Sequence, residues 1–298
     1  MTAIEWPRQD VQEVADGVVA IVQGHGESGV ANAGFVAADG GGEALVVDTM
    51  MFPEMAAGLV DALSARQLRA ATVLNTHHHI DHIGGNVVFA DARLVAHPAS
   101  IHTIETGGHP VGVYDAFMSQ FAGRFAGMEL ITPEPIDANH LDLPRDAELL
   151  PFVPAHTPAD VAVWVPGSRT LFTGDLCFFG VTPLAIQGLL SSWVAALDQL
   201  IALAPDAVVP GHGPVGTAAD IAVARDYLAA LVDHGRAAVE AGTELDDAVA
   251  EFRYQPSADW PESERTLVNL ERAMQEARGE ISTSDVSALP PSFARLLA

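Results

Sequence analysis

The chain has 298 residues, with 14 Lys and Arg against 39 Asp and Glu, which gives a formal charge of −25. All 14 cations are arginine, so the sequence excludes Schiff-base lysine chemistry and the Gly-Lys pair of a phosphate-binding P-loop. The acidic surplus also disfavours binding to nucleic acid or to an anionic membrane surface, because both depend on clustered cations.

The remaining composition is typical of a globular protein, with 49% hydrophobic and 18% charged residues. No window stays apolar for roughly 18 residues, so no membrane span is expected. The first residues form neither a basic nor an apolar leader, and Cys177 is the only cysteine. We therefore expect a cytoplasmic protein without an internal disulfide.

The first third of the chain alternates short apolar runs with turns. This pattern predicts strands over 18–22, 33–37, 44–47, 71–74 and 93–96, and a helix over 55–68. The rhythm breaks between 101 and 130, where large apolar side chains recur at helical spacing. We expect an amphipathic helix there that packs on the core or covers a pocket as a lid. The side chains are Tyr114, Phe117, Met118, Phe121, Phe125 and Met128.

The second half again mixes strands with helices. Strands are predicted over 149–153, 161–165, 170–173 and 207–209, and helices over 189–203, 217–238 and most of 243–298. The last helices carry one apolar stripe of Leu267, Leu270, Met274 and Ala277. Strands in both halves mixed with helices favour an α/β fold, in which two sheets face each other and helices cover the outside.

The most informative segment directly follows the fourth predicted strand. It contains His77, His79, Asp81 and His82, four side chains with metal-binding chemistry at tight spacing. Alternate side chains of an extended loop project to one side, which groups the first three and leaves His78 pointing elsewhere. His82 begins the following turn and can reach a second metal.

Three further candidate ligands come later in the chain, each near the end of a predicted strand. They are His156, Asp175 and His212. Functional groups of sheet proteins gather at strand ends on one rim, so we expect these side chains to join the earlier four. Seven nitrogen and oxygen ligands without a thiolate suit two borderline metals, most plausibly zinc, with iron or manganese as alternatives.

In this order the seven side chains resemble the ligand set of the metallo-β-lactamase superfamily. The resemblance implies a four-layer αβ/βα sandwich, with a catalytic domain over 1–240 and a helical C-terminal extension over 241–298 packed on it. It also implies that Asp175 bridges two metals. One metal would be bound by His77, His79 and His156, and the other by Asp81, His82 and His212.

Two further acids are expected to support these ligands. Asp48 ends the predicted strand 44–47 and resembles an aspartate that lies behind the metals in this family. Asp160, four residues past His156, either hydrogen-bonds that imidazole or stabilises a turn.

Metals held in this way would lower the pKa of a shared water from about 16 toward 7 and polarise an acyl carbonyl. Asp81 is the ligand carboxylate nearest to that water, so it is the residue expected to orient it and to shuttle protons. We expect a metal-dependent hydrolase of an activated acyl bond, with a bulky apolar thioester or ester as its small-molecule substrate.

A looser resemblance links the segments 155–164 and 172–176 to the polyketide cyclase/thioesterases of the same superfamily. It implies a role in antibiotic biosynthesis, with an acyl substrate that is free or bound to a carrier protein. Met and aromatic side chains suit a flat polycyclic ligand. The expected apolar pocket consists of Met50, Met51, Phe52, Tyr114, Phe117, Met118, Phe121, Phe178, Phe179 and Leu184.

Other functions stay open on the same fold. A lactonase or a glyoxalase II-like thioesterase would use the same ligands, although this chain has no lysine to hold glutathione. A mononuclear iron enzyme of the persulfide dioxygenase kind would use only part of the set, and a non-catalytic binding protein would show no turnover. The C-terminal helices either cap the pocket or form a homodimer contact.

Overall fold

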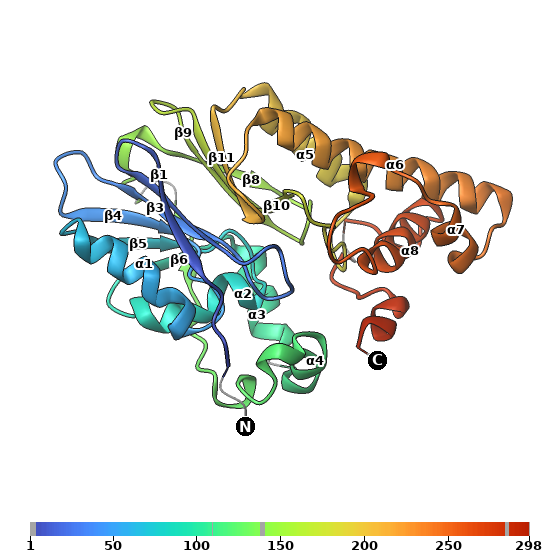
Figure 1. Ribbon diagram of the computed structural model, residues 1–298, viewed down its shortest axis with the longest axis horizontal. Helices are drawn as coiled ribbons and strands as arrows, with labels where there is room; N and C mark the ends of the chain where they lie inside the picture. The colour runs from blue at the N-terminus through green and yellow to red at the C-terminus, as the bar shows by residue number, and fades with distance from the viewer. Residues whose placement is uncertain (1–3, 109, 138–140, 284–285, 298) are drawn as a thin grey trace.

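The computed structural model describes residues 4–108, 110–137, 141–283 and 286–297 of the chain. In these residues the strands form two sheets that face each other, with helices on both outer sides (Figure 1). This arrangement is the predicted αβ/βα sandwich, with further helices at the C-terminal end.

The larger sheet has seven strands within the described residues. They follow chain order: β1 (Gln9–Ala15), β2 (Val18–Gln23), β3 (Ala33–Ala37), β4 (Glu43–Val47), β5 (Arg69–Leu74), β6 (Arg93–Ala96) and β7 (Glu134–Pro135). Strands β1 to β4 pair antiparallel, and β4 to β7 pair in parallel. The sequence did not predict β1, because this edge strand is polar and largely uncovered.

The smaller sheet has four strands within the same residues. Their order is β11 (Ala207–His212), β10 (Thr170–Phe178), β9 (Asp160–Val165) and β8 (Glu148–Phe152). Strands β8, β9 and β10 pair antiparallel, whereas β10 and β11 pair in parallel. Strand β10 is longer than predicted, and this extra length carries Asp175 within it.

Alternating side chains divide the apolar residues between two faces of each sheet. In β2, Val18 and Ala20 join an apolar cluster between the sheets that also contains Val163 of β9. Their neighbours Val19 and Ile21 instead pack on the helical side. Because successive side chains of a strand point to opposite faces of the sheet, one apolar run contributes both to the core between the sheets and to the core under the helices.

The predicted outer helices form where expected. On the larger sheet lies α1 (Pro53–Ala65), and on the smaller sheet lie α5 (Leu190–Ala202) and α6 (Ala218–Ala241) (Figure 1). Helix α1 buries Met55, Leu59 and Leu63, which recur every four residues on one face. Helix α6 begins with a capping box, in which Thr217 and Asp220 satisfy each other's backbone amides.

The predicted continuous helix over 101–130 is wrong. The segment contains two helices and two short turns: α3 (Pro98–Gly107), α4 (Val111–Phe117), and 3-10 turns over Ser119–Phe121 and Phe125–Gly127. Gly108 adopts a left-handed φ of 68°, which ends α3, and Pro110 cannot donate a helical hydrogen bond. Gly123, at φ 86°, separates the last two turns.

The C-terminal extension contains α7 (Leu245–Glu251), α8 (Arg265–Ala277) and a 3-10 turn over Pro291–Leu296. Leu270 and Ala273 of α8 belong to the same apolar cluster as α5 and α6. Within the predicted stripe, Leu270 and Met274 are buried, whereas Ala277 is exposed. Because this core continues across residue 240, the division of the chain there stays a prediction.

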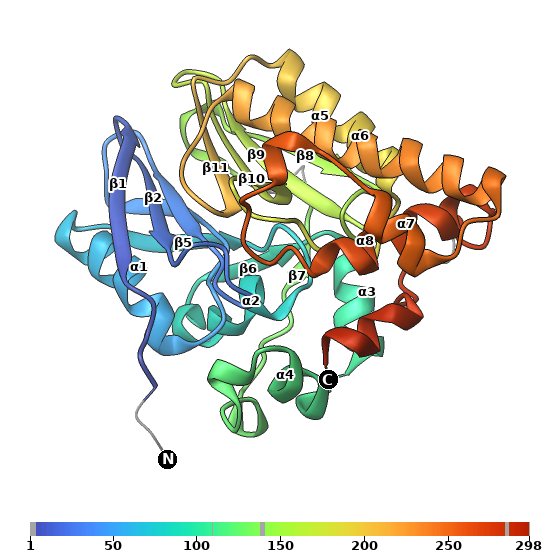
Figure 2. The same ribbon diagram turned by 45° about the vertical axis from the view of Figure 1, so that its right-hand side comes forward.

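The end of the chain returns to the region of α4, as Figure 2 shows. The rings of Phe117 and Phe293 lie 5.3 Å apart there. The extension therefore contacts the N-terminal half as well as the helices beside it in sequence. None of the helices in the described part of the chain is long and apolar enough to cross a bilayer.

Candidate metal centre

The seven predicted ligand side chains gather where strands of both sheets end. The loop after β5 and the short helix α2 (Ile80–Ile83) supply four of them, and the β8–β9 loop, β10 and β11 supply one each. Their ligand atoms form two groups, and within each group all ligand atoms lie within 4.8 Å of one another. The first group is His77, His79, His156 and Asp175, and the second is Asp81, His82 and His212. We call these seven residues the metal cluster.

Asp175 lies between the two groups. Its Oδ2 lies 3.8 Å from Nε2 of His77 and 3.4 Å from Nε2 of His156. Its Oδ1 lies 3.0 Å from Nε2 of His82 and 3.3 Å from Nε2 of His212. Each oxygen therefore faces one group, which is the position of a carboxylate that bridges two cations.

Asp48 orders the cluster from behind. Its Oδ2 lies 2.8 Å from Nδ1 of His82 and accepts a hydrogen bond from the Thr76 hydroxyl at 2.8 Å, and its Oδ1 accepts the Thr76 N–H. An N–H donated to Asp48 leaves Nε2 of His82 free for a metal. The backbone of Asp48 has a left-handed φ of 60°, a conformation that Asp tolerates better than most residues.

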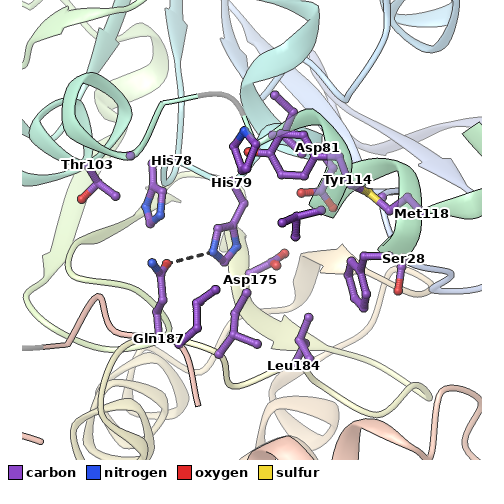
Figure 3. A pocket seen from close by; sticks show the side chains of 18 of the residues that line it. Ser28, His78, His79, Asp81, Thr103, Tyr114, Met118, Asp175, Leu184 and Gln187 are labelled. Carbon is purple, nitrogen blue, oxygen red and sulfur yellow. Dashed lines mark hydrogen bonds between the residues drawn. The ribbon is translucent and has the colours of Figure 1, made fainter. Parts of the chain in front are cut away.

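Two other imidazoles are held by their outer nitrogens. Nδ1 of His212 lies 3.1 Å from the carbonyl of Val30, and Nε2 of His79 lies 3.2 Å from Oε1 of Gln187 (Figure 3). The inner nitrogen of each ring then faces the cluster. Gly211 lets the backbone of β11 approach Asp175 closely, because a Cβ at this position would lie 2.0 Å from Oδ1 of Asp175.

Burial and mutual charge shift the protonation of these groups. Burial lowers the pKa of His77 well below its usual value, and the nearby imidazole of His82 lowers it further. Burial has the same tendency at His82, but Asp175 and Asp48 raise its pKa well above the usual value. Asp175 likewise overcomes burial at His212 and raises that pKa to about 9. Without metal, these shifts favour the neutral form of His77 and the protonated forms of His82 and His212.

The chemistry of the cluster fits two divalent cations. His77 Nε2, His82 Nε2 and Asp175 Oδ1 are buried without a hydrogen-bond partner, and a cation bound between the two groups would supply the partner that each lacks. Imidazole and carboxylate ligands suit zinc. Cys177 is not part of the set, because it packs in the apolar core and burial raises the pKa of its thiol to about 12.

Asp160 does not support a ligand imidazole. Its carboxylate accepts hydrogen bonds from the Thr157 N–H at 2.9 Å and the Thr157 hydroxyl at 3.0 Å, and Nδ1 of His156 has no partner. Asp160 therefore stabilises the turn that carries His156, the second of the two interpretations of the sequence. Burial raises its pKa to about 6.

A cavity of 390 Å³ opens over the cluster. Figure 3 shows Tyr114 and Met118 on one side of it and Gln187 and Leu184 on another, with His79 and Asp175 between them. Five of the predicted pocket residues line this cavity: Tyr114, Phe117, Met118, Phe178 and Leu184.

The other five predicted pocket residues do not line it. Met50, Met51, Phe52, Phe121 and Phe179 are almost fully buried in the apolar cores. The ring of Phe52 packs on that of Phe121 at 5.5 Å, for example. Met50, Met51 and Phe52 follow the end of β4 and Phe179 follows that of β10, as pocket residues would, but their side chains pack in the apolar cores, as does Phe121 of the 3-10 turn after α4.

Several lining residues were missed by sequence reasoning. They include Ile104, Val113, Ile186, Gln187, Leu289 and Phe293. We call Leu184, Ile186, Gln187, Leu289 and Phe293 the C-terminal wall, because they come from the loop after β10 and from the end of the chain. The apolar run Leu289-Pro-Pro-Ser-Phe293 was the available signal, but nothing in the sequence placed it near the metal ligands.

Helix α8 fixes the C-terminal wall through one polar face. Arg265, Asn269 and Arg272 recur at spacings of four and three residues and are all buried. Each binds the backbone of the loop that carries Gln187. Arg265 donates to the carbonyl of Thr182, Asn269 donates to Pro183 and accepts from Ala185, and Arg272 donates to Gly188, Val286 and Ala288.

Comparison with known proteins agrees with this geometry. Residues 26–212 match the family model of the metallo-β-lactamase superfamily. A hydroxyacylglutathione hydrolase from Cyanothece sp. is 32% identical over 163 residues, which is 53% of this chain and 54% of that protein. The chain thus spans about half the length of that relative. One from Shewanella oneidensis is 28% identical over 79% of this chain and 78% of its own.

Solved structures share the fold. A sec-alkylsulfatase from Pseudomonas sp. superposes with a TM-score of 0.65 at 17% identity, over 92% of this chain and 51% of its own. The fold, the ordered ligand set and the family match over most of the sandwich lead to one conclusion. This chain belongs to the metallo-β-lactamase superfamily.

Proposed function

We propose that the chain is a metal-dependent hydrolase that uses two zinc ions to cleave an ester or thioester acyl bond. The observation that carries the proposal is Asp175, whose two oxygens face two separate groups of ligands at the floor of a cavity. The named hydroxyacylglutathione hydrolases among its relatives support thioester chemistry.

Zinc bound at the cluster would supply Lewis-acid chemistry, polarising the acyl carbonyl and making water a better nucleophile at neutral pH. His77, His79 and His156 would hold one ion, and Asp81, His82 and His212 the other. The apolar side of the cavity would hold the acyl group and exclude bulk water from the reacting atoms.

Asp81 is the residue proposed to orient the attacking water. Burial works to raise the pKa of Asp81, but the hydrogen bond and charge of His212, together with His82, lower it to about 2. Asp81 is therefore ionised at neutral pH and can accept a hydrogen bond from water. Asp81 also lines the cavity, so a substrate carbonyl and this carboxylate can meet there.

The second ligand group supports two metals over one. A mononuclear iron enzyme would not need Asp81, His82 and His212 gathered within 4.8 Å. The apolar cavity wall supports the bulky apolar acyl group expected from the sequence. Ring closure of a polyketide rests only on the looser sequence resemblance, and a homodimer, a carrier-protein partner and a cytoplasmic location stay predictions.

The proposal is tested with purified protein and a panel of p-nitrophenyl esters, acyl thioesters, lactones and β-lactams. We expect stoichiometric zinc, hydrolysis of esters or thioesters, loss of activity on chelation, and recovery when zinc is restored. Activity that survives complete metal removal would contradict the proposal. Iron with oxygen-dependent turnover would favour the mononuclear alternative instead.

A further inference from the structure

The cavity over the metal cluster offers almost no positive charge to a substrate outside the cluster itself. Among the lining residues that the structure describes, Arg265 is the one arginine, and the chain has no lysine. Arg265 is 2% exposed. Its side chain is therefore packed within the wall of the cavity and is not free to move onto a bound ligand.

Arg265 is already engaged by the protein. Its Nη1 donates to the carbonyl of Thr182 at 2.8 Å, and its Nη2 donates to the Ser28 hydroxyl at 2.8 Å. Nη2 also lies 3.0 Å from the carboxylate of Glu262, which compensates its charge. Of its three nitrogens, Nε has no protein partner, but that atom is itself buried, so Arg265 does not present to a ligand the fork that binds a carboxylate.

Among the residues that the structure describes, the other lining groups outside the metal cluster and its neighbour His78 are uncharged. One side is apolar, with Ile104, Phe117, Leu184, Leu289 and Phe293 among its residues. Thr103, Gln187 and Ser287 provide neutral polar contacts. Such a surface binds alkyl, aromatic, carbonyl or hydroxyl groups, but burying a carboxylate or phosphate on it would be costly without a cation.

The charge of the whole chain acts in the same direction. At −25, the chain repels anionic molecules during approach, and salt screens this repulsion. Acyl-glutathione, acyl-coenzyme A and acidic carrier proteins all carry negative charge on the thiol side of the ester bond. Each would encounter long-range repulsion and then, outside the metal cluster, find no free arginine among the described residues that line the cavity.

We infer that the substrate is an uncharged ester or thioester of an apolar acid, free in solution, and that glutathione and coenzyme A thioesters are excluded. This inference rests on the proposed hydrolase function and narrows it to a substrate class. It also separates this chain from what the names of its hydroxyacylglutathione hydrolase relatives describe.

The test compares thioesters that share one aromatic acyl group but differ in the thiol. The zinc-loaded full chain is assayed with the N-acetylcysteamine, glutathione and coenzyme A thioesters. We expect kcat/KM to favour the neutral thiol by about 100-fold at low salt, with a smaller ratio at about 1 M salt because screening removes the long-range part.

The outcomes separate the two proposals. Glutathione or coenzyme A thioesters cleaved as well as the neutral one would overturn the substrate class and leave the hydrolase function standing. No cleavage of any ester or thioester by zinc-loaded protein would overturn both.

A charge variant tests the physical cause. Leu289 lines the cavity and is 47% exposed, so Leu289→Arg can place a cation there without disturbing a core. Val11, 44% exposed on β1 and outside the cavity lining, offers Val11→Arg as a control with the same net charge.

We expect Leu289→Arg to raise kcat/KM for the glutathione thioester about tenfold, and Val11→Arg to change it less than twofold. For each variant this value is divided by kcat/KM for the neutral thioester, so that a general effect of the Leu289 change on the wall cancels. An equal response of the two variants, with cleavage of the neutral thioester retained, would show that the missing cation does not set the discrimination.

Discussion

The metal cluster and the C-terminal wall line the same cavity but are built differently. The cluster side chains lie at the ends of strands in two paired sheets, and Asp48 and Asp175 connect them to one another. The wall consists of a loop and a chain end without strand pairing, attached through side-chain bonds from α8 to the backbone. The metal cluster is therefore held by strand pairing in the two sheets, whereas the wall, which carries proposed substrate contacts, is a separately attached segment.

This difference predicts two kinds of variant. Changes in the cluster should lower turnover for every substrate, whereas changes in the wall should depend on the size of the acyl group. A cluster variant whose effect depends on acyl size, or a wall variant that lowers turnover for every substrate, would contradict this difference between the two regions.

The largest effect is expected for Asp81→Asn. Loss of the carboxylate removes a proposed ligand and the group that orients water, so kcat should fall about 10²–10⁴-fold for small and bulky esters alike. Steady-state kinetics, metal content and a melting curve measure this, with exposed Asp61→Asn as the control. Nearly normal kcat in folded Asp81→Asn would remove Asp81 from the mechanism.

The next effect is a pH dependence of zinc affinity. The pKa of His212 is raised to about 9 and that of His82 is raised well above its usual value, so both imidazoles carry protons at neutral pH without metal. Zinc must displace these protons, which makes binding weaker as pH falls. Between pH 8 and 6 we expect affinity to drop about tenfold per pH unit for each proton released. Calorimetry in buffers of different ionisation enthalpy would count the protons, and zinc binding independent of pH would refute the expectation.

A wall variant should act differently. Asn269→Leu leaves the Ala185 N–H and the Pro183 carbonyl without their partner, which costs about 1–3 kcal/mol of stability. The displaced loop should raise KM for bulky esters several-fold and change acetyl esters little. Gln199→Leu on the exposed face of α5 is the matched control. An equal loss of kcat for all acyl sizes would place the wall within the catalytic machinery.

The smallest effect concerns the contact between the two regions. Gln187 accepts from Nε2 of His79 and donates to the carbonyl of Ser287, so it links a ligand to the end of the chain. Gln187→Met should weaken zinc binding up to about tenfold, and Gln187→Glu, which keeps the acceptor, should restore most of it. Zinc affinity unchanged in both variants would mean that the two regions are not coupled through this residue.

The sequence was informative where structure is local. His77 to His82 lie within a few residues, and His156, Asp175 and His212 each follow a recognisable strand pattern, so the cluster could be predicted. In the wall, Leu184 was predicted as a pocket residue, but the other members were not, because the wall joins segments that are distant in sequence. In the sequence, Arg265, Asn269 and Arg272 resemble the solvent-exposed face of an amphipathic helix. In the structure they are buried and donate hydrogen bonds to backbone carbonyls. Met50 and Phe52 looked like pocket residues, since a sequence does not show which way a chain turns after a strand.

Zinc titration of the metal-free protein tests the central claim most directly. Activity and bound zinc are followed together as equivalents are added. We predict that hydrolysis rises until two zinc ions are bound per chain, and that Asp81→Asn fails to regain full activity at the same occupancy. Full hydrolysis with no metal bound, or saturation of both signals without any hydrolysis of esters or thioesters, would contradict it.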